Sequence, residues 1–273
     1  MKFGVITIGD SASRGSFAEL AETVHYGLLS LGHDSVLTRR WLPDRRLILL
    51  GTPSIPLLGV VPPPGTVLYH CEQVYHGSPF VTPKMISILR QYPVVDFSRG
   101  NVIRLAAMGV RARWLPVGYA PELSRVRSAP EQDIDVLFYG TVSDRRRVVL
   151  DALFARGLRV QALGGVYGEP RDALIARSKV VINLHGKDED AVFESVRVSY
   201  LLANKKAVVS ERGDGHEDFA DAVLFADYGE LADRCAALVY DEAARADLSQ
   251  RGFNVMSARS EGDYLRAALA GFL

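Results

Sequence analysis

The chain has 273 residues, of which 48% are hydrophobic and 23% charged, the composition of a globular protein with a sizeable core. Its 32 basic residues equal its 32 acidic residues, so nucleic acid, which is bound through excess positive charge, is disfavoured as a partner. Two distant cysteines, no signal-peptide pattern and no run of 18 apolar residues predict a cytoplasmic protein without a disulfide framework or a membrane span.

The first 120 residues alternate between strand and helix patterns. Residues 3–8 have the pattern of a buried strand, and Ser16 and Glu19 have the spacing of a capping box at the start of a helix. Apolar residues then repeat at helical spacing up to Gly32, a residue typical of helix C-termini. The other strands predicted in this half are 36–41, 46–50, 67–69, 94–97 and 112–117, and the other helices are 84–90 and 101–108.

The segment 51–65 is rich in proline and glycine, which predicts a loop. It nevertheless carries five aliphatic residues, which are Ile55, Leu57, Leu58, Val60 and Val61. Either the loop packs these residues on its own lobe, or it makes a peripheral contact with a membrane surface or with a lipid-linked molecule. The sequence leaves both interpretations open.

A second series of strands and helices follows a polar stretch with two prolines at 121–132, which is typical of an interdomain linker. The predicted strands are 134–139, 159–163, 180–184, 207–210 and 223–226, and the predicted helices are 145–155, 171–177, 191–203, 230–240, 242–252 and 262–273. Two successive series of this kind predict an α/β protein with two Rossmann-like lobes and a cleft between them. We expect an N-terminal lobe (1–120), the linker (121–132), a C-terminal lobe (133–255) and a C-terminal helix (256–273) that packs back on the first lobe.

Basic residues follow the strand 134–139. Gly140 and Thr141 are small enough for a ligand to approach the end of the strand, where open α/β sheets bind their ligands. Arg145 and Arg146 then lie in the first turn of a helix, where positive charge opposes the helix dipole but a bound phosphate is favoured. The pattern therefore indicates either a diphosphate site or a solvated basic turn.

A second polar loop follows the strand 180–184. It contains His185, and the helix after it carries Glu194 and Arg197, which lie on one face because they are three residues apart. The carboxylate is suited to a ribose diol and the guanidinium fork to a diphosphate. An exposed ion pair on the helix is the alternative.

The segments 138–147, 181–185, 193–197 and 200–211 together resemble the donor-binding half of GT-B glycosyltransferases, most closely the group 1 and CgeB-like branch. The resemblance implies two Rossmann-like lobes, a nucleoside-diphosphate sugar (UDP- or GDP-linked) as co-substrate, no other cofactor and no metal. It also implies that Arg145 or Arg146, together with Arg197, contacts the diphosphate, and that Glu194 contacts the ribose or the sugar. Gly140, Thr141 and His185 complete the predicted donor site. Tyr200 stands where many retaining relatives carry a second glutamate.

Two residues of the first lobe are candidate catalytic groups. Asp10 follows the first strand, and His70 follows the strand 67–69. A histidine with an ordinary pKa of about 6.5 can remove the proton of an acceptor hydroxyl. His70 could also join Cys71, Glu72 and His76 in a zinc set, but the spacing matches no tight zinc motif, and no metal site is predicted.

The predicted function is transfer of a sugar from a nucleoside-diphosphate sugar to an unidentified hydroxyl-bearing acceptor. Two other enzyme classes are less well supported. The residues 188–190 form an Asp-x-Asp triplet that could hold a divalent cation, and the Gly-x-Gly-x-x-Gly fingerprint of a nicotinamide-dependent enzyme is absent. A non-catalytic protein that binds a sugar nucleotide or a glycan is the alternative function. The sequence does not determine the oligomeric state.

Overall fold

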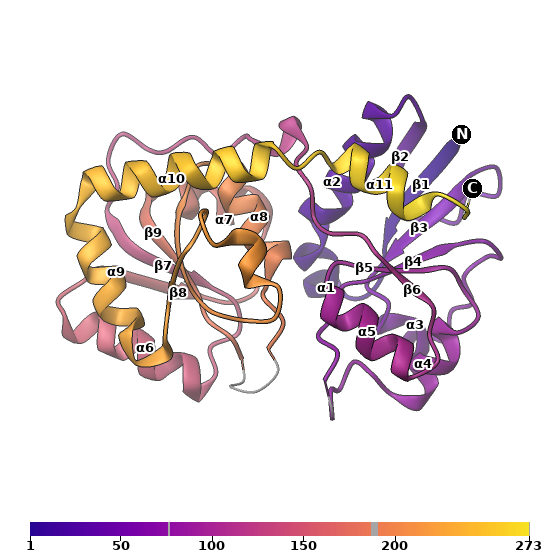
Figure 1. Ribbon diagram of the computed structural model, residues 1–273, viewed down its shortest axis with the longest axis horizontal. Helices are drawn as coiled ribbons and strands as arrows, with labels where there is room; N and C mark the ends of the chain where they lie inside the picture. Colours follow the sequence, from indigo (N-terminus) through magenta and orange to yellow (C-terminus); the bar gives the residue numbers. More distant parts are fainter. Residues whose placement is uncertain (76, 187–190, 273) are drawn as a thin grey trace. The chain divides into compact units, whose positions relative to one another are not determined.

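The computed structural model describes residues 1–75, 77–186 and 191–272 (Figure 1). The chain forms two compact units, one made of Met1–Ala120 with Arg259–Leu273 and the other of Pro121–Ala258. Each unit contains one parallel β-sheet with helices packed on it, so the predicted fold class is confirmed. None of the helices in the described ranges combines the length and the hydropathy that crossing a membrane requires.

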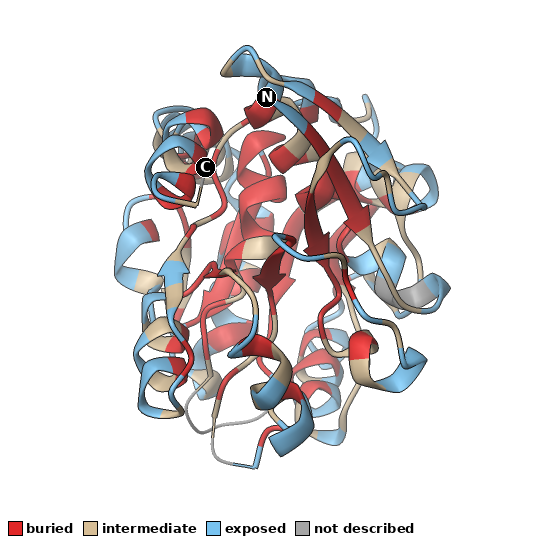
Figure 2. Ribbon diagram, turned by 90° about the vertical axis from the view of Figure 1, so that its right-hand side faces the viewer, coloured by how far each residue is buried: buried red, intermediate tan, exposed pale blue. Residues whose placement is uncertain are grey.

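The N-terminal unit contains a six-stranded sheet in the order β2-β1-β3-β4-β5-β6. Its strands are β1 (Lys2–Thr7), β2 (Asp34–Thr38), β3 (Arg46–Leu50), β4 (Val67–His70), β5 (Val94–Asp96) and β6 (Ala112–Trp114). Its helices are α1 (Ser11–Ser16), α2 (Ala18–Ser30), α3 (Ser54–Leu58), α4 (Pro83–Leu89), α5 (Arg99–Ala107) and α11 (Glu261–Leu269). The helices α3, α4 and α5 pack on one face, where Ile55, Met85 and Leu105 meet the apolar side chains of β1, β3, β4 and β5. Figure 2 shows the buried strands and the exposed outer surfaces of the helices.

Two features of this unit differ from the prediction. The helix predicted to start at Ser16 begins at Ala18, after Phe17, because Ser16 is the last residue of a separate short helix, α1, that the sequence did not predict. The segment 51–65 was predicted to be a loop but contains α3. Ile55 is 1% exposed in the core, whereas Leu57 and Val61 are 84% and 80% exposed. The segment thus anchors itself on its own unit and also presents apolar side chains outward.

The C-terminal unit contains a five-stranded sheet in the order β11-β10-β9-β7-β8. Its strands are β7 (Ile134–Tyr139), β8 (Val160–Leu163), β9 (Ser178–Asn183), β10 (Ala207–Glu211) and β11 (Leu224–Ala226). Its helices are α6 (Asp144–Ala155), α7 (Gly168–Arg177), α8 (Ser195–Ala203), α9 (Leu231–Tyr240) and α10 (Glu242–Ser257), with 3-10 turns at Pro121–Leu123, His216–Phe219 and Tyr228–Glu230. The helices α6 and α9 build an apolar cluster with the sheet. The helix predicted at 191–203 begins only at Ser195, because Val192 forms a β-bridge with Asp214.

The chain passes between the units at two neighbouring positions. Tyr119 and Ser260 form a parallel bridge, and Glu261 N donates to Tyr119 O at 3.1 Å. From there α11 packs on α2, as predicted for the C-terminal helix. The stretch predicted as a linker, 121–132, belongs to the second unit, where the amide of Val126 donates to Asn204 Oδ1 at 2.7 Å.

Candidate functional site

The predicted donor residues of the C-terminal unit lie where the strand order changes direction. β7 has β9 on one side and β8 on the other, and the loops after β7 and β9 therefore diverge at the carboxyl edge of the sheet, where such folds bind ligands. Gly140 follows β7 with a φ of 144°, and a Cβ at this position would lie 3.3 Å from Nη2 of Arg197. Because Gly140 has no side chain, the backbone of this loop can lie close to the Arg197 guanidinium.

Arg146 joins the two diverging loops. Its Nη1 donates to Thr141 O at 2.8 Å, and its Nε and Nη2 donate to Leu184 O at 3.0 and 2.7 Å. Nη2 also lies 3.4 Å from Glu194 Oε1. Burial lowers the pKa of Arg146, and the Glu194 carboxylate opposes this shift. Most donors of this guanidinium are therefore used to hold the loops in place.

Arg145 forms a fork with a carboxylate that the sequence analysis missed. Its Nη1 and Nη2 donate to Glu211 at 2.8 and 2.5 Å, and its guanidinium carbon lies 4.1 Å from the centre of the Tyr228 ring. Glu211 ends β10, is 5% exposed, and also accepts from the amide of His185 at 2.8 Å. The charge of Arg145 is therefore balanced inside the protein. An acidic residue at the end of the neighbouring strand was the signal that could have identified Glu211.

Arg197 is the guanidinium with donors to spare. Its Nη1 donates to Asn183 Oδ1 at 2.7 Å and to Glu194 Oε2. Asn183 ends β9 and is itself fixed, since its Nδ2 donates to Ser210 Oγ at 2.9 Å. Within the described ranges, Nε and Nη2 of Arg197 make no recorded hydrogen bond, and the side chain is 20% exposed. The cluster contains three guanidiniums and two carboxylates, which belong to Arg145, Arg146, Arg197, Glu194 and Glu211. Its net charge is therefore +1.

His185 contributes mainly through its backbone. The ring is 3% exposed, its Nε2 lies 3.0 Å from Arg212 O, and its Nδ1 is buried without a partner among the described residues. The carbonyl of His185 accepts from Arg145 at 3.3 Å and its amide donates to Glu211. The residue thus belongs to the same network as the predicted arginines.

A second cluster adjoins Arg197 through an aromatic ring. Tyr200 donates to Asp172 Oδ2 at 2.7 Å, and Arg171 donates to Asp172 Oδ1 at the same distance. The guanidinium carbons of Arg171 and Arg197 lie 5.6 and 5.5 Å from the centre of the Tyr139 ring. Tyr200, which stands where many retaining GT-B enzymes carry a second glutamate, thus has its hydroxyl paired with a carboxylate from α7.

The N-terminal unit contains a buried histidine–carboxylate pair. His70 and Asp96 lie opposite each other on β4 and β5, and His70 Nδ1 lies 2.8 Å from Asp96 Oδ2. Asp96 also accepts from Ser98 N at 2.8 Å and from Asn101 Nδ2 at 3.0 Å, while burial raises its pKa. In the neutral tautomer that donates from Nδ1 to the carboxylate, His70 Nε2 is an acceptor. Nε2 is buried without a partner among the described residues, as is Oγ1 of Thr52, which follows the neighbouring strand β3.

The two predicted catalytic residues follow strands that are not neighbours in the N-terminal sheet. Asp10 is an exposed residue after β1, and β3 lies between β1 and β4, the strand that ends at His70. Glu72 follows His70, and burial raises its pKa to about 7. His76 and the triplet 188–190 lie outside the described residues. Within those residues, no group of three or more His, Cys, Asp or Glu side chains is placed to bind a metal ion.

Two viral proteins share part of this sequence. The uncharacterized protein L140 of Acanthamoeba polyphaga mimivirus is 31% identical over 165 residues, which are 55% of this chain and 53% of that protein. The uncharacterized protein L137 of the same virus is 31% identical over 123 residues, 43% of this chain and 16% of its own length. The chain therefore spans about half of the first relative and less than a fifth of the second. No family model matches the sequence.

Solved structures match the whole chain. A mutant of T4 phage BGT in complex with UDP-glucose has a TM-score of 0.66 at 14% identity and covers 100% of this chain and 99% of its own. Anabaena Alr3699/HepE in complex with UDP and glucose has a TM-score of 0.65 at 12% identity, covering 99% of both chains. AviGT4, a glycosyltransferase involved in avilamycin A biosynthesis, has a TM-score of 0.60 at 18% identity, covering 99% and 98%. The chain therefore has the GT-B fold that the sequence predicted.

Proposed function

We propose that this protein is a glycosyltransferase that moves a sugar from a nucleoside-diphosphate sugar to a hydroxyl-bearing acceptor without a metal ion. The observation that carries the proposal is Arg197, which Asn183 and Glu194 hold through a single nitrogen while Nε and Nη2 make no recorded bond within the described ranges. A pre-positioned guanidinium of this kind stabilises the charge that develops on a departing diphosphate. The solved structures in complex with UDP-glucose or UDP support a UDP-sugar as the donor, with a GDP-sugar as the alternative.

We assign different roles to the three arginines. Arg197 contacts the diphosphate, whereas Arg145 and Arg146 act as positioning residues because Glu211 and backbone carbonyls use their donors. Gly140 and Thr141 form the backbone wall of the donor site, His185 fixes the loop after β9, and Glu194 orients Arg197. This division predicts that Arg197 cannot be replaced by either neighbour.

We further propose that His70 is the general base and Asp96 its positioning residue. The acceptor hydroxyl would give its proton to Nε2 of His70 while its oxygen bonds to the anomeric carbon of the sugar. The bond between that carbon and the diphosphate oxygen then breaks, and the diphosphate leaves with the electron pair. The hydrogen bond from Nδ1 to Asp96 supports this role because it stabilises the imidazolium that forms. Asp10 is the second candidate base.

A non-catalytic protein that binds a sugar nucleotide or a glycan would need the donor cluster but not a base. The two functions are separated by the release of nucleoside diphosphate from UDP-glucose, with and without an added acceptor mixture. His70→Gln should abolish this release and leave donor binding within about twofold of the wild type. Binding without any release in the wild type would favour the non-catalytic protein.

The decisive experiment is a thermal-shift and calorimetric screen against UDP, GDP and their glucose derivatives. Arg197→Ala should weaken binding of the selected nucleotide about 10- to 100-fold, as expected for the loss of a charge-assisted hydrogen bond. Arg147→Ala is the matched control, since Arg147 is an exposed arginine next to Arg146 in the same helix. Donor affinity that is equal in both variants and in the wild type would contradict the proposed donor site.

A further inference from the structure

The charges of the N-terminal unit are unevenly distributed. Residues 51–120 contain six basic and only two acidic residues, although the whole chain is neutral. The two acids, Asp96 and Glu72, are fully buried and half-buried, respectively. The basic residues are Lys84, Arg90, Arg99, Arg104, Arg111 and Arg113. No exposed carboxylate of this stretch therefore balances its cations in the part that the structure describes.

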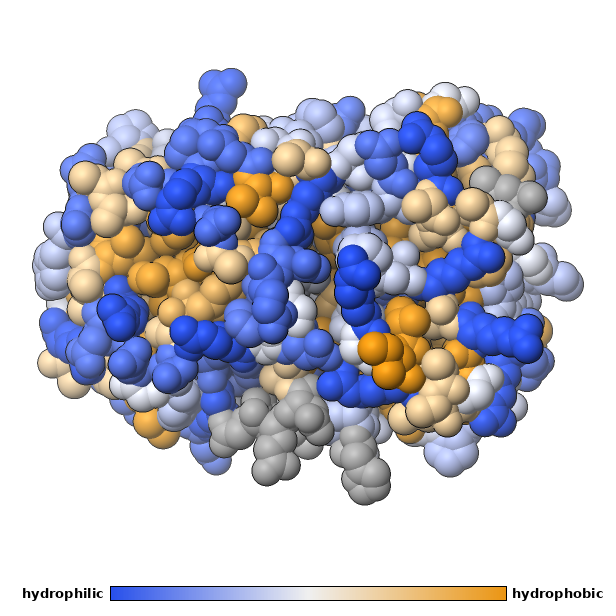
Figure 3. Space-filling model, viewed as in Figure 1, coloured by the Kyte–Doolittle hydropathy of each residue, from blue (hydrophilic) through white to orange (hydrophobic). Residues whose placement is uncertain are grey.

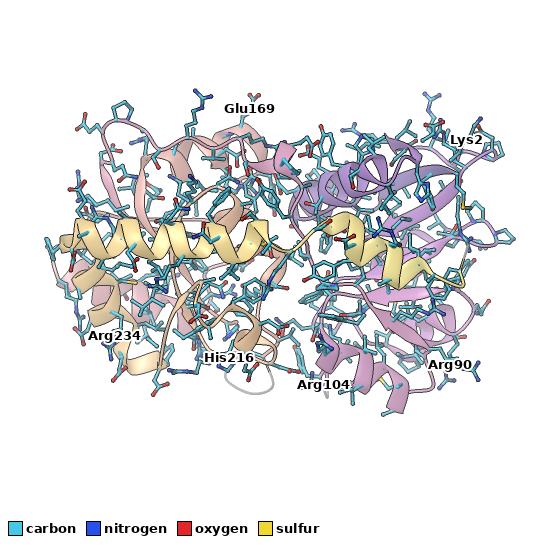
Figure 4. All side chains as sticks on the ribbon, turned by 45° about the horizontal axis from the view of Figure 1, so that its top comes forward. Lys2, Arg90, Arg104, Glu169, His216 and Arg234 are labelled. Carbon is cyan, nitrogen blue, oxygen red and sulfur yellow. The ribbon has the colours of Figure 1, made fainter. Side chains whose placement is uncertain are left out.

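Three helices of this stretch form one layer on the sheet, and basic side chains join them. The helices α3, α4 and α5 pack on the same face. Lys84 of α4 donates to Pro56 O in α3 at 3.1 Å, and Arg90 after α4 donates to Met108 O after α5 at 2.6 Å. Figure 4 labels Arg90 and Arg104 at the periphery of the N-terminal unit. Lys84 and Arg90 thus lie at the seams of one helical layer, which we call the α3–α5 face, whereas Arg113 of β6 donates to Ala268 O of α11.

Large apolar side chains project from the same face. Leu57, Leu58 and Val61 are 84%, 56% and 80% exposed, and Ile103 of α5 is 71% exposed. Within the same helices, Ile55 and Leu105 are 1% and 0% exposed and hold α3 and α5 on the sheet. In Figure 3 apolar and hydrophilic surfaces lie side by side over this part of the N-terminal unit. Exposed apolar groups gathered among polar ones are typical of an interaction surface.

We propose that the α3–α5 face binds peripherally to the surface of an anionic lipid bilayer. The cations match the negative headgroups, and the aliphatic side chains enter the boundary between headgroups and acyl chains. A nucleic-acid duplex would also bind the cations through its phosphates. It would provide no apolar environment for the three exposed aliphatic side chains of residues 57–61. This surface is independent of the proposed transfer reaction. It extends the membrane contact considered for residues 51–65 to α4 and α5.

The proposal predicts two separable contributions to binding. Each cation near an anionic surface strengthens binding about fivefold at moderate salt, and salt screens this contribution. The aliphatic contribution is insensitive to salt, because it depends on the apolar area removed from water. Binding should therefore require both anionic lipid and the exposed aliphatic residues.

The test uses flotation of the full chain with vesicles of phosphatidylcholine alone and with phosphatidylglycerol added. The apolar variant is Leu57→Ser/Leu58→Ser/Val61→Ser, and its control is Val148→Ser, which changes a valine that is 60% exposed on α6 of the other unit. Wild type and control should float with anionic vesicles only, and the apolar variant should lose about tenfold or more in binding. Unchanged melting temperatures would show that the variants are folded.

A charge variant and a competing ligand complete the test. Lys84→Gln/Arg90→Gln should weaken binding to anionic vesicles about 25-fold, and raising the salt concentration should weaken the wild type likewise. Failure of the wild type to float with anionic vesicles, or equal flotation with neutral ones, would overturn the proposal. The proposal would also be overturned if the protein bound a random DNA duplex and if this binding depended on the two cations but not on the three aliphatic residues. The face would then be a nucleic-acid surface.

Discussion

Glu261 is a buried acid at the point where the chain returns to the N-terminal unit. It is 0% exposed, its Oε2 accepts from Gly118 N at 2.7 Å, and its Oε1 has no hydrogen-bond partner among the described residues. Burial raises its pKa to about 8 from 4.5, and the bond from Gly118 only partly offsets this shift. We therefore predict that the protonated form of Glu261 is the one the fold favours.

The sign and size of the effect follow from the linkage between ionisation and folding. Because the folded pKa is the higher one, the stability that the protonated acid contributes is complete below pH 4.5 and is lost as the pH rises through 8. One pKa unit corresponds to about 1.4 kcal/mol, so ionisation of Glu261 should cost about 2 kcal/mol between pH 6 and pH 8. For a chain of this size, that cost lowers the melting temperature by about 4–8 °C.

The assay is thermal and urea-induced unfolding of the wild type and of Glu261→Gln at pH 6 and pH 8. Glutamine keeps an oxygen for the amide of Gly118 but cannot ionise, so the variant should lose most of the pH-dependent destabilisation that the wild type shows. Glu230→Gln is the control, because its carboxylate is 56% exposed. If wild type and Glu261→Gln lose equal stability between the two pH values, Glu261 is not the titrating group and the reasoning is refuted.

Three further predictions concern packing and the candidate site. Gly27→Ala should destabilise the protein by about 1–3 kcal/mol in urea unfolding, because the added Cβ would lie 2.5 Å from Glu261 Cγ. Gly229→Ala is the control. Its Cβ would meet nothing within 4 Å, so the stability should not change. Glu211→Gln should cost about 3 kcal/mol of stability by leaving a largely buried arginine without its anion, and an unchanged urea midpoint would argue against this pair. Asn183→Ala should weaken donor binding about tenfold in calorimetry without a large change in melting temperature, since it frees the guanidinium that we assign to the diphosphate.

Much of the arginine cluster that we propose as the donor site was predictable because local rules place it. A glycine after β7, arginines at the start of α6 and the Glu194–Arg197 pair all sit at strand ends or helix starts, and parallel strands bring those positions to one edge of a sheet. The proposed division of roles among the arginines was not predictable. It depends on Glu211, which is 66 residues from Arg145 in the chain, and no local pattern specifies which carboxylate will meet which guanidinium.

The sequence by itself determined the alternation of strands and helices, and with it the α/β class and the two sheets, because hydrophobic periodicity is a local property of the chain. Only the tertiary structure decided the partners. Asp96 meets His70 because β4 and β5 are neighbours, and Leu57 points outward while Ile55 is buried because α3 turns between them. Such pairings arise from strand order and helix packing, which bring distant residues together through contacts that no short stretch of sequence encodes.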